Sequence, residues 1–209
     1  MSVSRRTVLL ALSSLFAVPA VRAAGTSEAD ALRKMHAFIE ATPYAQGRFR
    51  QTSVDREGRE TAAPSEGIFR FLRPGFFEWS TQKPYEQKIF SNARQLWIYD
   101  PDLTQVTVRR ITQEMTNSPA GLLFGTDNLE KVARLSMADP DTVAADFFNK
   151  GGTFSSALVR FKGNELASLT LKDNFGQTVT VEFLEFTLSE QNKGSFEFRI
   201  PRGADVLEM

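Results

Sequence analysis

The feature that most constrains the fold of this chain is the shortness of the links between its strand-like segments. From Arg48 onward, apolar and polar residues alternate in short runs, which is typical of strands with one buried face. The links between these runs, such as Asp55–Gly58 and Asn92–Ala93, hold only a few residues, mostly turn formers. A parallel pair of strands needs a crossover of about a dozen residues or more. The chain therefore predicts an antiparallel meander and not a parallel sheet.

The predicted sheet is long enough to curl. Its strands, roughly eleven in number, are expected at residues 48–54, near 61, and at 67–72, 76–80, 86–91, 95–100, 104–111, 157–162, 165–172, 177–188 and 195–200. A small barrel fills its interior with side chains, whereas a larger or incomplete one encloses a cavity. The sequence favours a mainly β protein in which helices cover the mouth of a curled sheet.

About three helices complete this prediction. Ser27 and the acidic residues after it mark the start of the first helix, whose apolar stripe runs from Leu32 to Ile39 and ends before Pro43. A second helix is expected at 118–125 and a third from Asp127. Both are too short to be stable alone. They are therefore expected to lie on the open face of the sheet.

The amino terminus predicts export. Arg5 and Arg6 precede an apolar run from Val8 to Val18, and Val21-Arg22-Ala23 supplies the small residues that a signal peptidase reads. The run is shorter than the about 20 residues that a membrane anchor needs, so we interpret residues 1–23 as a cleaved signal peptide. The paired arginines leave Sec and twin-arginine export both open. Residues 24–209 then form a single domain, expected in the periplasm.

The composition favours binding over catalysis. The chain has no cysteine and a single histidine, His36, and it contains no GxSxG, HExxH or P-loop motif. Asp100 and Asp102 could act as the paired carboxylates of a glycosidase-like site, but Pro101 between them indicates a turn. The sequence has no basic patch, so we do not expect nucleic acid as a partner. We therefore expect no enzymatic activity, no cofactor and no metal site.

A set of motifs runs in order through nearly the whole mature chain. They are Phe49-Arg50-Gln51, Arg73-Pro74 with Phe77 and Trp79, Lys83-Pro84, Leu96 to Leu103 with Gln105-Val106, Pro119-Ala120 with Leu122-Leu123, Leu171-Lys172-Asp173 with Gly176-Gln177, and Phe196-Glu197-Phe198 with Pro201, Gly203 and Asp205-Val206. Together they resemble the outer-membrane lipoprotein carrier family (LolA). The block from Trp97 to Val106, with Arg73-Pro74, is the most specific part of the resemblance.

The resemblance implies an incomplete, unclosed antiparallel β-barrel with a helical lid over a hydrophobic cavity. It also implies a monomeric periplasmic shuttle that takes acylated lipoproteins from an inner-membrane, ATP-driven release complex and delivers them to an outer-membrane receptor. A periplasmic binder of another apolar ligand, or a signalling regulator with the same fold, stays open as an alternative. Two segments depart from the family pattern. The hairpin at Ser91–Arg94 lacks the usual glycine, and Leu135–Thr153 matches too little to assign part of the lid and the cavity rim.

Five apolar residues on the predicted strands are expected to line the acyl cavity: Phe49, Phe69, Phe71, Leu96 and Ile98. Burying one methylene group is worth about 0.8 kcal/mol, so exposing a chain of about sixteen carbons to water costs on the order of 12 kcal/mol. Non-directional contacts would offset that cost for many lipoproteins that share only their acyl groups. The alternative is that these side chains simply fill a core.

Arg73 is the sharpest single candidate. Alternation places it on the same side as Phe69 and Phe71, where an arginine is costly unless its donors are satisfied. We expect it to latch the lid by hydrogen bonds to backbone carbonyls of the lid helices, until acyl chains displace that contact. The alternatives are a solvated rim position or a salt bridge with an acid such as Glu66.

Phe77 and Trp79 lie beside the bend at Pro74-Gly75. By the resemblance, they are the candidates for contact with partner proteins at the barrel mouth. For Phe77, a core or cavity position is the alternative.

Overall fold

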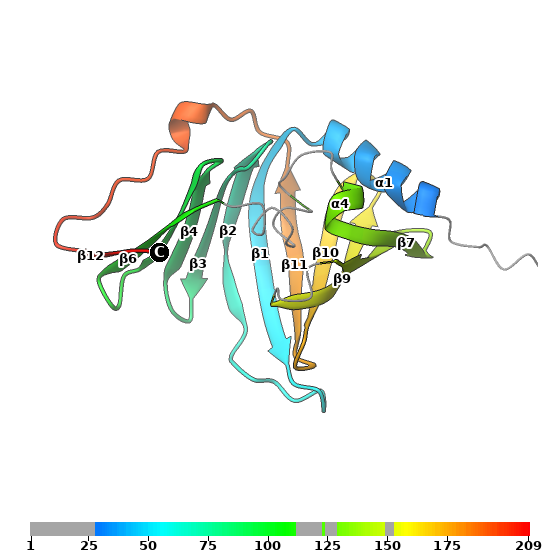
Figure 1. The fold of residues 1–209 in the computed structure, drawn as a ribbon, viewed down its shortest axis with the longest axis horizontal. Coiled ribbons are helices and arrows are strands. Elements are labelled where there is room, and N and C mark those ends of the chain that lie inside the picture. The colour runs from blue at the N-terminus through cyan, green and yellow to red at the C-terminus, as the bar shows by residue number, and fades with distance from the viewer. Residues whose placement is uncertain (1–27, 112–122, 124–128, 149–152) are drawn as a thin grey trace, which may run out of the picture.

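A single curved sheet dominates the protein (Figure 1). The structure is a computed structural model that describes residues 28–111, 123, 129–148 and 153–209. Its elements are α1 (Glu28–Ala41), β1 (Tyr44–Val54), β2 (Ser65–Leu72), β3 (Phe76–Lys83), β4 (Gln87–Asn92), β5 (Gln95–Asp100), β6 (Gln105–Arg110), α4 (Leu129–Val132), β7 (Ala133–Asp139), β8 (Thr142–Phe147), β9 (Phe154–Lys162), β10 (Glu165–Asp173), β11 (Thr178–Thr187), the 3-10 turn η1 (Lys193–Ser195) and β12 (Asp205–Glu208).

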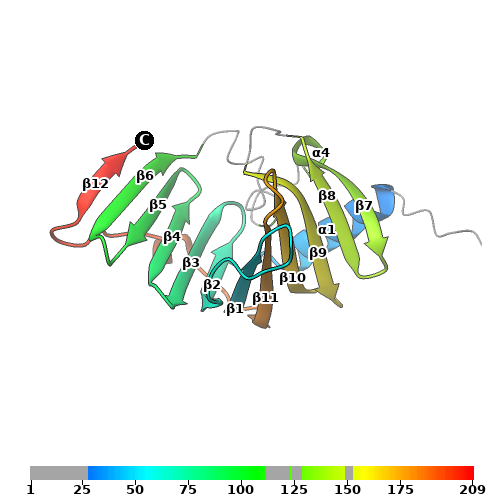
Figure 2. The same cartoon turned by 90° about the horizontal axis from the view of Figure 1, so that it is seen from below.

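Two meanders share this sheet and meet at one seam. The strand order is β12-β6-β5-β4-β3-β2-β1-β11-β10-β9-β8-β7, so β1 to β6 form one half and β7 to β11 the other. The seam is the antiparallel pair of β1 and β11. Figure 2 shows the sheet as an arc with β12 at one end and β7 at the other. Twelve strands thus form an open, unclosed sheet within the described residues, as the prediction of an incomplete barrel requires.

The alternation that predicted the strands also fixes which face each residue occupies. On β2, Gly67, Phe69 and Phe71 are buried, while Ile68 is exposed on the opposite face. Residues paired across an antiparallel ladder share a face. The pairs Phe69↔Trp79 and Phe71↔Phe77 therefore carry the same face onto β3.

The structure differs from the predicted sheet in four places. Residues 195–200 form no strand, because they cross the sheet as an extended strap held by side chains. Leu135–Thr153, which the sequence left unassigned, contains most of the edge hairpin of β7 and β8. β12 was missed, and it pairs with β6 in parallel, an exception to the antiparallel prediction. The expected return strand near residue 61 is reduced to an isolated bridge between Val54 and Glu60.

Helix α1 is confirmed within a residue of its predicted end. Glu28 and Asp30 occupy its first turn, where they oppose the helix dipole, and its buried residues are Ala31, Met35, Phe38 and Ile39. Thr42 closes the other end: its N–H and its hydroxyl both donate to the Phe38 carbonyl, at 3.0 and 2.6 Å.

The lid is smaller than predicted within the described residues. They contain two α-helices, α1 and the single turn α4, in place of about three. The helix predicted at 118–125 lies outside the described residues except for Leu123, which is helical and buried in the core. The signal peptide at 1–23 also lies outside them. None of the helices that the structure describes is long and apolar enough to cross a membrane.

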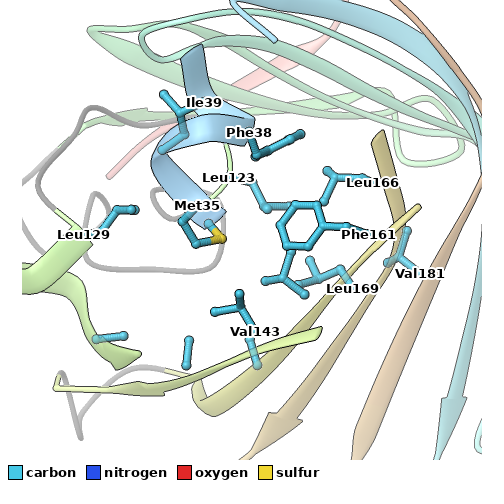
Figure 3. Packing of buried hydrophobic residues seen from close by; sticks show 14 of the residues in the cluster. Met35, Phe38, Ile39, Leu123, Leu129, Val143, Phe161, Leu166, Leu169 and Val181 are labelled. Carbon is cyan, nitrogen blue, oxygen red and sulfur yellow. The ribbon is translucent and has the colours of Figure 1, made fainter. Parts of the chain in front are cut away.

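The main core lies between α1 and the inner face of the sheet. Figure 3 shows Met35 and Phe38 of α1 directed at Phe161, Leu166 and Leu169 of β9 and β10. A second, separate apolar cluster lies on the outer face, where the strap passes over β3 to β6. Its rings are Phe76, Phe90, Trp97, Tyr99, Phe196 and Phe198.

Candidate functional site

The inner face of the sheet brings the predicted site residues together. Phe49 pairs with Phe183, and the pairs Ile89↔Ile98 and Ser91↔Leu96 extend the face of Phe69 and Phe71 as far as β5. All five predicted cavity residues, together with Phe77 and Trp79, therefore share one face of a continuous sheet. Their burial divides that face into two parts.

The first part is sealed. Phe49, Phe69 and Phe71 are 1%, 3% and 0% exposed and belong to the main core. Gly67 makes this packing possible, because a Cβ there would lie 2.8 Å from the Phe49 ring and 2.1 Å from the Ser80 carbonyl oxygen. The Phe49 ring instead crosses β2 and stacks on Trp79, with 3.8 Å between centroids. In this structure, these three side chains fill a core, as the alternative had it.

The second part is partly open. Phe77, Trp79, Ile89, Leu96 and Ile98 are all intermediate in exposure. Phe77 and Trp79 also pack against the main core. The apolar face thus continues from the sealed region into a half-exposed surface on β3, β4 and β5. The predicted cavity residues divide between the two regions, with Leu96 and Ile98 in the open one.

Arg73 lies where the end of α1 meets the end of β2. Its Nε donates to the Thr42 carbonyl oxygen at 3.0 Å and one terminal nitrogen donates to the Thr42 hydroxyl at 3.3 Å. The guanidinium lies 4.9 Å from the Phe38 ring centroid and 4.7 Å from that of Phe71. A cation at the carbonyl end of a helix also opposes the helix dipole. Arg73 therefore joins α1 to the sheet through hydrogen bonds and through ring faces.

The suggested salt bridge between Arg73 and Glu66 was wrong. Glu66 lies near the opposite end of β2, and a strand rises about 3.3 Å per residue, so the two residues are roughly 20 Å apart. The arginine that forms an ion pair on this strand is Arg70, on the outer face. Its Nε donates to Glu78 at 2.6 Å, and another nitrogen donates to the Ser195 carbonyl at 2.9 Å, which fastens the strap.

Sequence reasoning missed the partners of Arg73. The apolar stripe from Leu32 to Ile39 includes Phe38, and Thr42 precedes the proline that ends the helix, but the pattern links neither residue to Arg73. The sequence did hold a signal for the contact between Thr42 and Arg73. A threonine just before Pro43 is suited to close a helix whose last carbonyls lack partners, and those carbonyls attract a cation.

The acidic residues that stand out serve turns. Asp55 accepts the N–H groups of Arg59 and Glu57 at 2.9 and 3.0 Å, and the hydrogen bond from Arg59 lowers the pKa of its carboxyl group. The hydroxyl of Thr142 lowers the pKa of Asp139. Asp100 accepts the Leu103 N–H at 3.3 Å, as expected of a turn. Within the described part of the chain, no three histidine or acidic side chains gather as a metal ion would require.

A shallow hollow of about 300 Å³ lies among β1, β2, β3 and β11. Much of its lining is charged or polar, including Arg48, Arg70, Glu78 and Glu185. Arg48 and Glu185 pair across it at 3.4 Å. These four charged side chains make the hollow a poorer site for an acyl chain than the apolar inner face.

Comparison with known proteins decides the family. The model of the outer membrane lipoprotein carrier protein LolA matches residues 41–199. The chain belongs to the LolA family. An outer-membrane lipoprotein carrier protein from Bordetella pertussis is 37% identical over 94% of this chain and 95% of its own length. Another from Methylobacillus flagellatus is 35% identical over 86% of this chain and 89% of its own length.

Solved structures agree on the LolA fold. A LolA superfamily protein from Nitrosomonas europaea superposes with a TM-score of 0.50 at 11% identity, covering 82% of this chain and 98% of its own. An uncharacterised protein from Thermus thermophilus gives 0.52 at 12% identity, covering 86% and 99%. At such identities the likeness concerns the fold alone.

Proposed function

We propose that this protein is a periplasmic carrier that shields the acyl chains of lipoproteins from water between the inner and the outer membrane. The observation that carries the proposal is the apolar inner face, which runs without interruption from the sealed core under α1 to the half-exposed Leu96 and Ile98. Membership of the LolA family, and the names of the relatives, point the same way.

An acyl chain would first lie on the open part of this face and then extend from there into the sealed part. Sequestering about sixteen methylene groups is worth on the order of 12 kcal/mol, so even partial exchange of water for aromatic rings favours uptake. The side chains that now pack against Phe69 and Phe71, such as Phe183 and Phe186, would have to move aside. The same rings would then serve as core when the carrier is empty and as cavity wall when it is loaded.

Arg73 is the proposed latch of the empty state. Its bonds to Thr42 hold the end of α1 beside Phe71, and an acyl chain that reaches this point competes for the same ring. Phe77 and Trp79, on the neighbouring strand, are the proposed contacts with partner proteins. We propose an inner-membrane, ATP-driven release complex as the donor of cargo and an outer-membrane receptor as its acceptor, because the chain carries no nucleotide-binding motif of its own.

Depletion of the protein tests the carrier role. Lipoproteins should then accumulate in the inner-membrane fraction, and the intact chain should restore their delivery. Arg73→Leu should fold normally but restore delivery poorly, whereas Arg48→Leu, which removes a charge from the outer face, should restore it fully. Normal sorting after depletion would contradict the carrier role. Full rescue by Arg73→Leu would contradict the latch alone.

The two tryptophans offer a direct test of where acyl chains bind. Trp79 lies on the inner face, stacked on Phe49, and Trp97 lies on the outer face, stacked on Phe198. A brominated acyl chain quenches nearby indole fluorescence. It should quench the Trp97→Phe variant, in which Trp79 remains, and leave the Trp79→Phe variant nearly unchanged. The reverse pattern would place the acyl chain on the outer face and contradict the proposed binding surface.

A further inference from the structure

The two ends of α1 are attached to the sheet in different ways. At its carboxyl end, Thr42 and Pro43 lead directly into β1, and the Arg73 N–H donates to the Pro43 carbonyl at 2.8 Å. This end is therefore held by the chain itself, and breaking the side-chain bonds of Arg73 would not let it move far. At its amino end, the predicted cleavage site leaves only residues 24–27 before the helix. A displacement of α1 must be largest at this end.

Among the described residues, Lys34 is a polar side chain that ties the amino half of α1 to the sheet. Its Nζ donates to the Pro140 carbonyl oxygen at 2.9 Å and lies 3.4 Å from Oδ1 of Asp141, both in the turn between β7 and β8. The same ammonium group lies 5.4 Å from the centroid of the Phe161 ring. The Lys34 side chain is only 24% exposed, which is low for a lysine.

The turn between β7 and β8 is preformed to receive this lysine. Oδ1 of Asp139 accepts the Asp141 N–H at 2.8 Å, which closes the turn and fixes the Pro140 carbonyl between them. Asp139 also bonds the Thr142 hydroxyl. Because the acceptor is already ordered, forming the bond costs entropy mainly in the Lys34 side chain and little in the turn.

Between the clasp at Lys34 and the attachment at Thr42 lies the apolar face of α1. Met35 and Phe38 occupy this interval and cover the core (Figure 3). Among the described strands, the backbone of α1 approaches β7 and β8 most. We propose that Lys34 is the releasable clasp of α1, and that the helix swings about Thr42 and Pro43 when it uncovers the inner face for an acyl chain. This proposal rests on the proposed carrier function. The proposed latch at Arg73 controls access to the Phe71 ring beside the pivot, and Lys34 holds the end of α1 that swings.

Hydrogen exchange tests the clasp without any ligand. Lys34→Met keeps the apolar stem and removes the donor, so the amides of the amino half of α1 should exchange about fivefold faster, the amount expected of a half-exposed charged hydrogen bond. Amides of β10 should exchange as before. Lys34→Arg should restore protection. Arg33→Met removes a neighbouring, exposed charge that pairs only with Asp30 of the same helix, three positions away, and should leave the exchange of these amides close to that of the unmodified protein. Unchanged exchange in Lys34→Met would overturn the proposal.

A chemical bridge tests the swing itself. The chain has no cysteine, so Lys34→Cys combined with Asp141→Cys offers a short bismaleimide only its two intended targets. Before bridging, this variant should take up a fluorescent triacylated lipopeptide faster than the unmodified protein; after bridging, uptake should fall at least tenfold. Uptake at the unbridged rate would overturn the proposal. Failure of every form to bind the lipopeptide would instead count against the carrier function, and hydrogen exchange would still decide the clasp.

Discussion

At the scale of single residues, alternation predicted faces well and partners poorly. It placed Arg73 beside Phe71 correctly, because a strand leaves no freedom in the direction of its side chains. It could not name Thr42 as the acceptor, since the approach of α1 to the end of β2 depends on the packing of the whole inner face. The roles of the candidate residues in binding stay proposals for the same reason. The local sequence determines which face of the sheet a side chain occupies, but tertiary packing determines whether that face can be uncovered.

Ala93 shows how a local departure from the family pattern is accommodated. It has a φ of 67°, in the left-handed region that favours glycine. Neighbouring side chains support this conformation: Ser91 accepts the Ala93 N–H, and Asn92 accepts the N–H groups of Arg94 and Gln95. The missing glycine therefore leaves the pairing of β4 with β5 in place.

The loop between β1 and β2 should respond to acid through Asp55. Its hydrogen bonds lower its pKa in the folded protein below the usual value of 3.8, so the ionised group stabilises the loop above that pH. This stabilisation is lost as the pH falls through the lowered pKa. Asp55→Asn should therefore lower the melting temperature at pH 7, and the difference from the unmodified protein should shrink toward pH 3. A difference that is equal at both pH values would contradict this account.

At the scale of elements, the sequence pattern missed the hairpin of β7 and β8 and wrongly predicted a strand at residues 195–200. Ala133, Leu135 and Met137 alternate with polar or small residues, and Val143, Ala145 and Phe147 do the same, so the edge hairpin was readable. In contrast, Phe196, Phe198 and Ile200 also alternate, yet form no strand. The rings of Phe196 and Phe198 pack on the outer-face aromatics, and β12 occupies the edge of β6. Alternation alone cannot distinguish a strand from a strap that packs in this way.

The strap and β12 should protect the edge of β6. β12 satisfies the backbone groups of β6 over Gln105 to Val108, and unpaired strand edges promote association. Ending the chain after Arg202 should therefore produce concentration-dependent association in sedimentation velocity. Removing only Met209 is the matched control and should leave the sedimentation unchanged. A shortened chain that shows no association at any concentration would contradict this role.

At the scale of the whole molecule, one sheet separates two tasks between its faces. The inner face carries the aromatic residues of the main core and packs against α1, the helix that we propose to move, whereas the strap packs on the outer face, which no proposed step disturbs. The open, curved sheet followed from the sequence because its strands are many and their links short. Its strand order did not, since the seam joins segments such as Arg48 and Glu185, which lie 137 positions apart.

That seam should be the last part of the sheet to form. Each half is a chain of hairpins between neighbouring strands, whereas the pairing of β1 with β11 must close a long loop first. Pulse-labelling hydrogen exchange during refolding should find the amides shared by β1 and β11 protected after those within β3 to β5. Simultaneous protection throughout the sheet would contradict this order.

Late formation of the seam would leave the incompletely folded chain prone to aggregation. Until β11 arrives, Phe49, Phe69 and Phe71 have no cover from the second half, and β1 presents a bare edge beside them. An aromatic surface next to an unpaired strand is the combination that drives aggregation. The apolar inner face that we propose to receive acyl chains is thus also the surface through which an incompletely folded chain is most prone to aggregate.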